Sequence, residues 1–204
     1  MKTEIIPVIH MLNKKQVFYN VETCISCGIK KVFIIKHKVG VLDLRQCALE
    51  VKDKYNIWVG MNLLDMPAKL AISLVHSHID GIWCDETIER GWERKYKGML
   101  FGGVAFKYQP QPSNLKQVCE EATLLTDVAT TSGAGTGLAA NLDKIKLMRS
   151  YLGDHPMAIA SGVSIENISD YNGLVDYALV ATSITDIDEM IIKEELSQLI
   201  SKIK

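Results

Sequence analysis

Two short segments in the C-terminal half of the chain contain residue types suited to binding an anion. Ser161-Gly162 follows the apolar run Met157–Ala160. Thr182-Ser183 follows the apolar run Tyr177–Val180. A small residue lets the backbone approach a ligand closely, and the N–H groups of a loop or of a helix that begins there can face a negative charge. The two segments therefore predict a site for a phosphate group.

A pair of carboxylates, Asp85-Glu86, stands at the end of another apolar run, Gly81–Asp85. A carboxylate in that position can act as a general base or bind a sugar hydroxyl. Successive residues of a strand point to opposite faces, so one of the two can face a site at the strand end. We predict that Asp85 has the functional role and that Glu86 begins the next helix, where a negative charge is favourable.

Two histidines, His10 and His37, follow the first two apolar runs. Imidazole titrates near neutral pH, so a histidine at a strand end can transfer protons. With Asp85, the two histidines could instead ligate a divalent metal. No helix-spaced pair of histidines supports that alternative. We predict His10 and Asp85 as an acid and base, His37 as a ligand-binding residue, and no metal or cofactor.

Two lysines at strand ends, Lys107 and Lys36, have two interpretations. A desolvated lysine can attack a carbonyl and form a Schiff base, as in an aldolase, which makes Lys107 a catalytic candidate. The simpler interpretation is a solvated lysine or one that pairs with phosphate. Asn62 either orients a substrate hydroxyl or caps the turn that follows it. Gly133 belongs to a glycine-rich segment without the lysine of a P-loop, and it either contacts the ligand or lies in a flexible loop.

The elements that must position these residues alternate along the chain, short apolar runs with longer amphipathic ones, as in a parallel sheet covered by helices. The predicted strands are Ile5–His10, Lys31–Ile35, Ile57–Asn62, Gly81–Asp85, Met99–Phe106, Val128–Thr131, Met157–Ser161 and Tyr177–Val180. The predicted helices are Val21–Gly28, Leu42–Tyr55, Pro67–His78, Ile88–Lys95, Asn114–Leu125, Asn141–Leu152, Ile165–Asn172 and Glu189–Ile203.

Eight strand–helix units within 204 residues predict an α/β protein of one domain, residues 1–204, folded as a closed (β/α)8 TIM barrel. The alternative is an open doubly wound sheet, which normally has a glycine-rich turn after its first strand. This chain has no such turn. In a barrel the loops after the seventh and eighth strands usually hold phosphate, and Gly162 and Thr182 follow those two strands.

Composition restricts the class of protein. The net charge is −1 and the charges are interleaved, which gives no indication of a general nucleic-acid surface. The sequence shows neither a secretory signal nor an apolar stretch that could cross a bilayer. Five scattered cysteines are typical of free thiols in a reducing compartment, so we expect a cytoplasmic protein. A short barrel with modest outer helices is also a candidate for a homo-oligomer.

Three segments of the C-terminal half resemble the BtpA family: Thr131–Gly137, Ala160–Ile168 and Leu179–Ile184. The most specific is Ser161-Gly162-Val163-Ser164-Ile165-Glu166-Asn167. Earlier in the chain, Val59–Asn62 and Ile9-His10 look like the ends of the family's third and first strands. The resemblance implies a phosphate-binding barrel and a divergent, shortened member. Phosphoribosylanthranilate isomerase is similar through the same phosphate loops, but this chain has His10 and Thr131 or Ser132 where that enzyme has its cysteine and aspartate.

The chain departs from the BtpA pattern after the second strand, where Lys36-His37-Lys38 replaces acidic and amide residues, and after the eighth, where Thr185 replaces a lysine. Two functions remain open at this point. One is an isomerase or lyase that binds a small phosphorylated metabolite, either a sugar phosphate or a nucleotide-like ester. The alternative is a non-catalytic barrel for assembly or ligand sensing that retains only the phosphate site.

Overall fold

The structure, a computed structural model, describes residues 2–37, 40–63, 66–75, 77–85, 96–107 and 109–203. Its strands are β1 Glu4–His10, β2 Lys31–Ile35, β3 Trp58–Asn62, β4 Gly81–Cys84, β5 Met99–Gly103, β6 Val128–Ser132, β7 Met157–Ala160 and β8 Tyr177–Val180. Its helices are α1 Lys14–Ser26, α2 Val41–Lys54, α3 Ala68–Leu74, α4 Leu115–Leu125, α5 Leu142–Leu152 and α6 Lys193–Ser201, with the 3₁₀ helices η1 Ile168–Tyr171 and η2 Thr182–Ile184.

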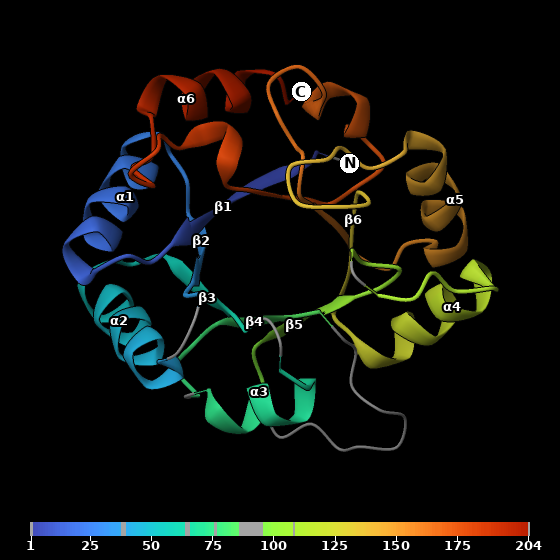
Figure 1. The fold of residues 1–204 in the computed structure, drawn as a ribbon, viewed down its shortest axis with the longest axis horizontal. Coiled ribbons are helices and arrows are strands. Elements are labelled where there is room, and N and C mark those ends of the chain that lie inside the picture. Colours follow the sequence, from blue (N-terminus) through green and yellow to red (C-terminus); the bar gives the residue numbers. More distant parts are fainter. Residues whose placement is uncertain are drawn as a thin grey trace.

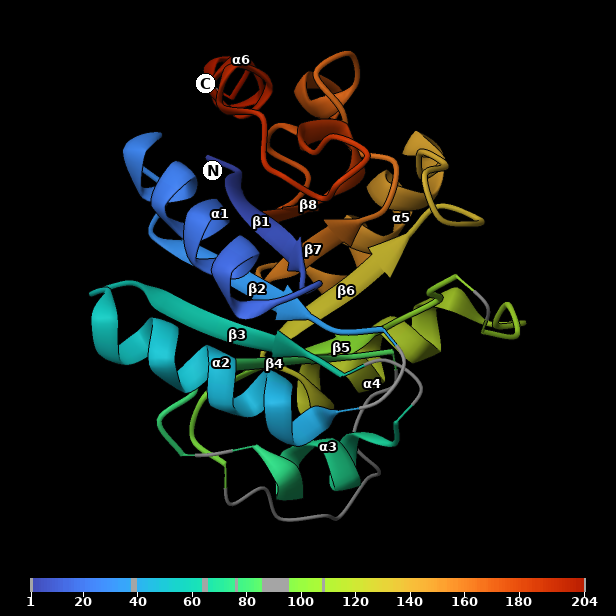
Figure 2. The ribbon, with the colours of Figure 1, turned by 60° about the vertical axis from the view of Figure 1, so that its left-hand side comes forward.

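The strands form a closed parallel barrel in the order of the sequence, which confirms the predicted fold class. β1 pairs with β2 on one side and with β8 on the other, so the first and last strands close the ring. Figure 1 shows the helices on the outside of this ring, and Figure 2 shows α6 beside α1 next to the β1–β8 seam. No helix within the described residues is long and apolar enough to cross a membrane.

Alternate residues of each strand face the barrel interior, as a period of two requires. The inward side chains include an aromatic cluster, in which the ring of Phe33 packs edge to face against those of Trp83 and Phe101. Gly60 makes room for Phe33, and Gly81 makes room for Trp58, because a Cβ on either glycine would overlap that ring. The barrel is therefore filled at this level.

The same parity directs the next inward residues toward the carboxyl ends of the strands. Four inward positions lie on the first four strands: Val8, Ile35, Gly60 and Trp83. The residues two positions later are His10, His37, Asn62 and Asp85. The polar groups predicted at the ends of the first four strands thus share the inner face of the barrel.

Several helix boundaries differ from the prediction. α1 begins at Lys14 rather than Val21, because the side chain of Asn13 caps it by accepting a hydrogen bond from the N–H of Gln16. α6 begins at Lys193 rather than Glu189, because Glu189 has a backbone φ of 57°, which is incompatible with a helix. The predicted helix Ile88–Lys95 lies outside the described residues.

The predicted helix Ile165–Asn172 is only the 3₁₀ helix η1. The amide of Asn167 closes a turn ahead of it, since Oδ1 accepts from the Ser164 N–H and Nδ2 donates to the Gly162 carbonyl. An asparagine that bonds to neighbouring backbone groups in this way competes with a regular helix.

Candidate functional site

A cavity of about 610 Å³ lies at the carboxyl ends of the strands. A volume of this size holds a small organic molecule. The structure brings nearly all of the predicted site residues to its wall, and they are His10, His37, Asn62, Asp85, Lys107, Ser161, Gly162, Thr182 and Ser183.

Gly133 is the predicted site residue that does not line the cavity. A Cβ at this position would overlap the carbonyl oxygens of Leu138 and Ala139, so the glycine allows the loop after β6 to fold back on itself. The glycine-rich sequence thus serves the packing of its own loop.

Ser161, Gly162, Thr182 and Ser183 lie together at one end of the cavity, and we call these four residues the anion corner. The two loops are joined directly, because the Ser183 hydroxyl donates a hydrogen bond of 2.7 Å to the Val163 carbonyl. Their proximity follows from the pairing of β7 with β8. The phosphate site predicted from the sequence requires these two loops to be adjacent, and in the structure they are.

Gly162 is required for two reasons that do not involve a ligand. Its φ is +66°, a conformation that glycine adopts without strain, and a Cβ there would overlap the backbone of Leu138 and Ala139. The loop after β7 thus packs against the loop after β6. Ser161 also has a positive φ of 65°, and its hydroxyl lies within 2.9 Å of the Lys107 ammonium.

Backbone donors are available at the anion corner. Within the described part of the chain, the N–H groups of Gly162, Thr182 and Ser183 donate to no protein acceptor. Thr182 and Ser183 are the first residues of η2, and the first N–H groups of a helix lack partners within the helix. Backbone N–H groups without an acceptor favour an anion.

Lys107 points toward the anion corner. Its Nζ lies 2.9 Å from Ser161 Oγ and 3.1 Å from Thr136 Oγ1. The other lysine considered from the sequence, Lys36, pairs with Asp43 at 3.0 Å and is not part of the cavity wall. The structure thus favours a role for Lys107 beside an anion.

A second lysine, Lys144 of α5, supports the segment that carries Lys107. Its Nζ donates to the carbonyl oxygens of Ala105 at 2.6 Å and Ser132 at 3.1 Å. Burial lowers the pKa of Lys144 below its ordinary value. Lys144 connects the ends of β5 and β6 and helps to set the position of Lys107.

At the other side of the cavity, His10 has a carboxylate partner. Its Nδ1 lies 3.2 Å from Glu189 Oε1. Because a carboxylate only accepts hydrogen bonds, the contact assigns the proton of the neutral ring to Nδ1. Nε2 is then the ring nitrogen that can accept a proton from a ligand.

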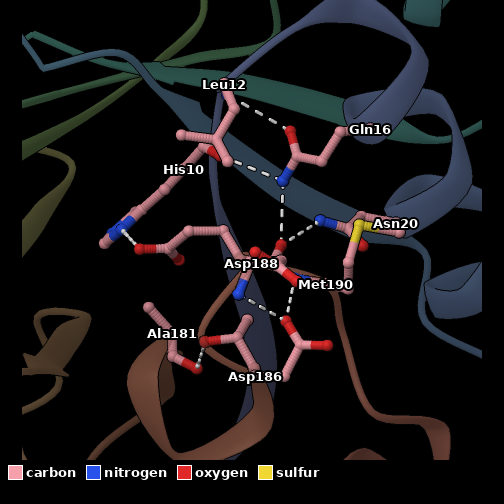
Figure 3. Close-up of polar contacts among 10 residues, drawn as sticks. His10, Leu12, Gln16, Asn20, Ala181, Asp186, Asp188 and Met190 are labelled. Carbon is pink, nitrogen blue, oxygen red and sulfur yellow. Dashed lines mark hydrogen bonds and ion pairs between the residues drawn. The ribbon is translucent and has the colours of Figure 1, made fainter.

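The segment that carries Glu189 is held by buried amides. The Glu189 carbonyl accepts hydrogen bonds of 2.8 Å from both Gln16 Nε2 and Asn20 Nδ2, and Asn20 Oδ1 accepts from the Ile191 N–H. Figure 3 shows Gln16 and Asn20 of α1 directed at this segment, next to His10. The contacts explain how Glu189 keeps a positive φ, a conformation that costs a non-glycine residue about 1 kcal/mol or more.

Glu189 was not identified from the sequence. It lies 179 positions from His10, and the sequence pattern placed it at the start of the last helix. Closure of the barrel is what brings the two together, since β1 and β8 are neighbours and the segment after β8 folds back over the end of β1.

The neighbouring residues complete this side of the cavity. The His37 ring meets the His10 ring edge to face, with centroids 5.1 Å apart. Asp85 lines the cavity as predicted, while Glu86 lies outside the described residues. In the described ranges, no three His, Cys, Asp or Glu side chains come together as a metal-ligand set, so the metal alternative of His10, His37 and Asp85 lacks its ligand geometry.

Asn62 and Trp83 lie at the base of this side. Their exposed fractions are 2% and 6%, and both line the cavity. Neither polar atom of the Asn62 amide, nor the Trp83 indole nitrogen, has a hydrogen-bond partner in the described structure. Trp83 also packs against Phe33 and Phe106, and the parity of β4 places it on the inner face of the barrel.

No protein-family model matches the chain, and no curated protein matches it in sequence. Solved structures share its fold. A native KDPGal structure is 12% identical, with a TM-score of 0.74 over 99% of this chain and 95% of the other. Phosphoribosylanthranilate isomerase from Thermotoga maritima is 11% identical, with a TM-score of 0.69 over 98% and 97% of the two chains.

A third similar structure is a 4-hydroxy-2-oxoglutarate/2-dehydro-3-deoxyphosphogluconate aldolase. It is 8% identical, with a TM-score of 0.67 over 100% of this chain and 96% of the other. At these identities the similarity establishes a barrel of the type found in aldolases and isomerases, while function has to be argued from the site.

Proposed function

We propose that this protein binds a small phosphorylated metabolite, a sugar phosphate or a nucleotide-like ester, with its phosphate group in the anion corner. The proposal depends on one observation: Gly162, Thr182 and Ser183, whose N–H groups have no acceptor in the described structure, line the same cavity as Lys107, whose ammonium contacts Ser161. Hydrogen bonds between such donors and an ionised acceptor are stronger than those between neutral groups. The position also matches the usual phosphate site of this fold.

We further propose that the bound molecule undergoes proton transfer, as in an isomerase or a lyase. His10, oriented by Glu189, and Asp85 line the same cavity as the anion corner. A base and an acid on one bound molecule are the minimal set for moving a proton between carbon and oxygen. His10 accepts or returns the proton through Nε2, and Asp85 acts on the neighbouring oxygen or carbon.

Membership of the BtpA family is part of this proposal. It is supported by the segment Ser161–Asn167, whose Asn167 closes the turn beside Gly162, and by Thr182-Ser183 in η2. These are the residues that build the anion corner, so the family resemblance and the proposed phosphate site depend on the same loops.

A substitution of Thr182 tests the anion corner. Thr182 is exposed at the start of η2, so Thr182→Asp adds a negative charge with little effect on packing. We expect affinity for inorganic phosphate to fall by at least about tenfold, because like charges about 4 Å apart repel by about 4 kcal/mol at an effective dielectric constant of 20. Isothermal titration calorimetry measures the change. Thr182→Asn, of the same shape without the charge, should bind nearly as the parent does, and equal affinities for the two variants would refute the site.

A substitution of Lys107 tests its assignment to the phosphate. Lys107→Met should weaken binding of inorganic phosphate by about 10- to 150-fold, since a hydrogen bond to a charged group contributes about 1.5–3 kcal/mol. Lys36→Met is the matched control, because it removes the same charge from a lysine outside the cavity. The same titration compares them. If both variants lose affinity equally, the effect is one of overall charge, and Lys107 does not contact the phosphate.

A further inference from the structure

The carboxylate of Glu189 reaches His10 from a strained backbone. Glu189 has a φ of 57°, and its Oε1 lies 3.2 Å from His10 Nδ1. A residue other than glycine keeps such a conformation only where the surrounding structure holds it there. A change of φ turns the side chain relative to its neighbours, so a relaxed Glu189 would no longer direct its carboxylate at the imidazole. The contact between the two side chains therefore depends on whatever holds this backbone.

One amide group of α1 binds the main chains of both residues. Gln16 Nε2 donates to the His10 carbonyl at 3.1 Å and to the Glu189 carbonyl at 2.8 Å, and Figure 3 shows both bonds. An amide nitrogen carries two hydrogens, so this single atom links the two carbonyl groups. Gln16 Oε1 accepts from the Leu12 N–H at 3.3 Å, which ties the same side chain to the chain after β1. Gln16 thus sets the separation of the two main chains.

Asn20 holds the same segment from the next turn of α1. Residues four positions apart lie on one face of a helix, so Gln16 and Asn20 are directed at the same segment. Asn20 Nδ2 donates to the Glu189 carbonyl at 2.8 Å, and Oδ1 accepts from the Ile191 N–H at 2.9 Å. The Asn20 side chain is fully buried, so water does not compete for these bonds. Asn20 therefore fixes the backbone of residues 189–191.

We propose that Gln16 and Asn20 are positioning residues that act on His10 through Glu189. By holding the Glu189 backbone at a positive φ, they keep its carboxylate on Nδ1 and leave Nε2 as the nitrogen that accepts a proton. In a neutral imidazole the hydrogen bond made by one ring nitrogen decides where the proton resides. Without the carboxylate the proton is free to move to Nε2, which then cannot accept another. The consequence for proton transfer rests on the proposed function, whereas the tautomer itself does not.

The tautomer of His10 is measured without any ligand. Long-range ¹H–¹⁵N NMR of the full ¹⁵N-labelled chain, recorded at a pH where histidine side chains are neutral, distinguishes a protonated ring nitrogen from an unprotonated one. The signals of His10 are those that His10→Gln removes. We expect Nδ1 of the parent protein to carry the proton, because a carboxylate accepts hydrogen bonds only. A parent ring that is protonated at Nε2 overturns the inference.

Variants of Glu189 test the contact with the ring. Glu189→Met, close in shape, removes the acceptor and should move part of the His10 population to the Nε2–H tautomer. Glu189→Gln keeps an acceptor oxygen in the same place and should retain the Nδ1–H tautomer of the parent. Identical spectra for the methionine variant and the parent would show that Glu189 does not set the tautomer, and the inference would be wrong.

Variants of the amides test the positioning role. Asn20→Leu should move the His10 population in the same direction, although the hydrogen bonds of Asn20 go to the backbone of residues 189 and 191. Gln16→Met, also close in shape, replaces it if that variant does not fold. Tyr171→Phe is the matched control, because it also removes a buried hydrogen bond, to the Ala140 carbonyl, outside the cavity wall. Folded amide variants that keep the parent tautomer would show that the amides serve stability alone.

The link to proton transfer has a separate readout. Asn20→Leu should slow the exchange of carbon-bound hydrogen in a bound sugar phosphate with D₂O by about 10- to 100-fold, the usual cost of misplacing a reacting group. Its affinity for inorganic phosphate should stay unchanged, because Asn20 lies outside the cavity wall. A changed tautomer with an unaltered exchange rate overturns the positioning role in catalysis. If the parent protein exchanges no hydrogen of any sugar phosphate, the proton transfer of the proposed function fails, while the tautomer measurement still decides the roles of Gln16 and Asn20.

Discussion

Replacing His10 by glutamine is expected to slow the exchange of a ligand's carbon-bound hydrogen with solvent deuterium by about 10²- to 10⁴-fold, the usual contribution of a positioned acid or base. Glutamine keeps a polar side chain of similar length but cannot accept and return a proton. The experiment follows the tightest-binding sugar phosphate in D₂O by proton NMR, with and without the protein. The product does not have to be identified, since exchange reports the proton transfer alone.

The matched control for this experiment is His78→Gln. His78 is exposed and lies outside the cavity wall, so the same chemical change there should leave the exchange rate unaltered. An unchanged rate in the His10 variant would exclude His10 as the acid or base. If the parent protein catalyses no exchange in any bound sugar phosphate, the proton-transfer proposal fails, and the non-catalytic ligand-sensing barrel becomes the better account.

Gly162→Ala should destabilise the fold by about 3 kcal/mol. A residue with a Cβ at positive φ costs about 1–2 kcal/mol, and the overlap with the backbone of Leu138 and Ala139 adds about 1–3 kcal/mol. Because relief of that overlap has to move the loops after β6 and β7, phosphate binding should weaken as well. Urea denaturation gives the free energy of unfolding.

Gly137 provides the comparison for Gly162. It lines the same cavity and has a φ of +75°, but a Cβ there would meet nothing within 4 Å. Gly137→Ala should therefore lose only about 1–2 kcal/mol, the strain of the backbone conformation. If the two alanine variants are equally stable, the packing of the loop after β7 against the loop after β6 is not the reason for glycine at position 162.

The positions of the strands could be predicted from the sequence because each buried parallel strand leaves an apolar run of its own. Alternation also predicted that one of Asp85 and Glu86 faces the site. In the structure Asp85 lines the cavity, as do His10 and Asn62, both predicted at strand ends. The closed barrel followed from the count and spacing of the units, and solved structures of similar topology share it.

What could not be predicted depends on contacts between distant parts of the chain. The pairing of Glu189 with His10 needs the closed β1–β8 seam and the amides of Gln16 and Asn20, none of which leaves a local pattern. For Gly133 the sequence left two alternatives open, since glycine is required equally where a loop meets a ligand and where it meets its own backbone. The cap at Asn13, in contrast, is a local signal that marks the start of α1.

The contact between His10 and Glu189 has a consequence for how the protein is made. His10 and Glu189 lie 179 positions apart, so the pair cannot form before the chain between them has been synthesised. A proteolytic cut shortly before Asp186 would separate the partners while leaving all of the strands in place. A chain that stops before Glu189 therefore lacks the carboxylate that contacts the His10 ring.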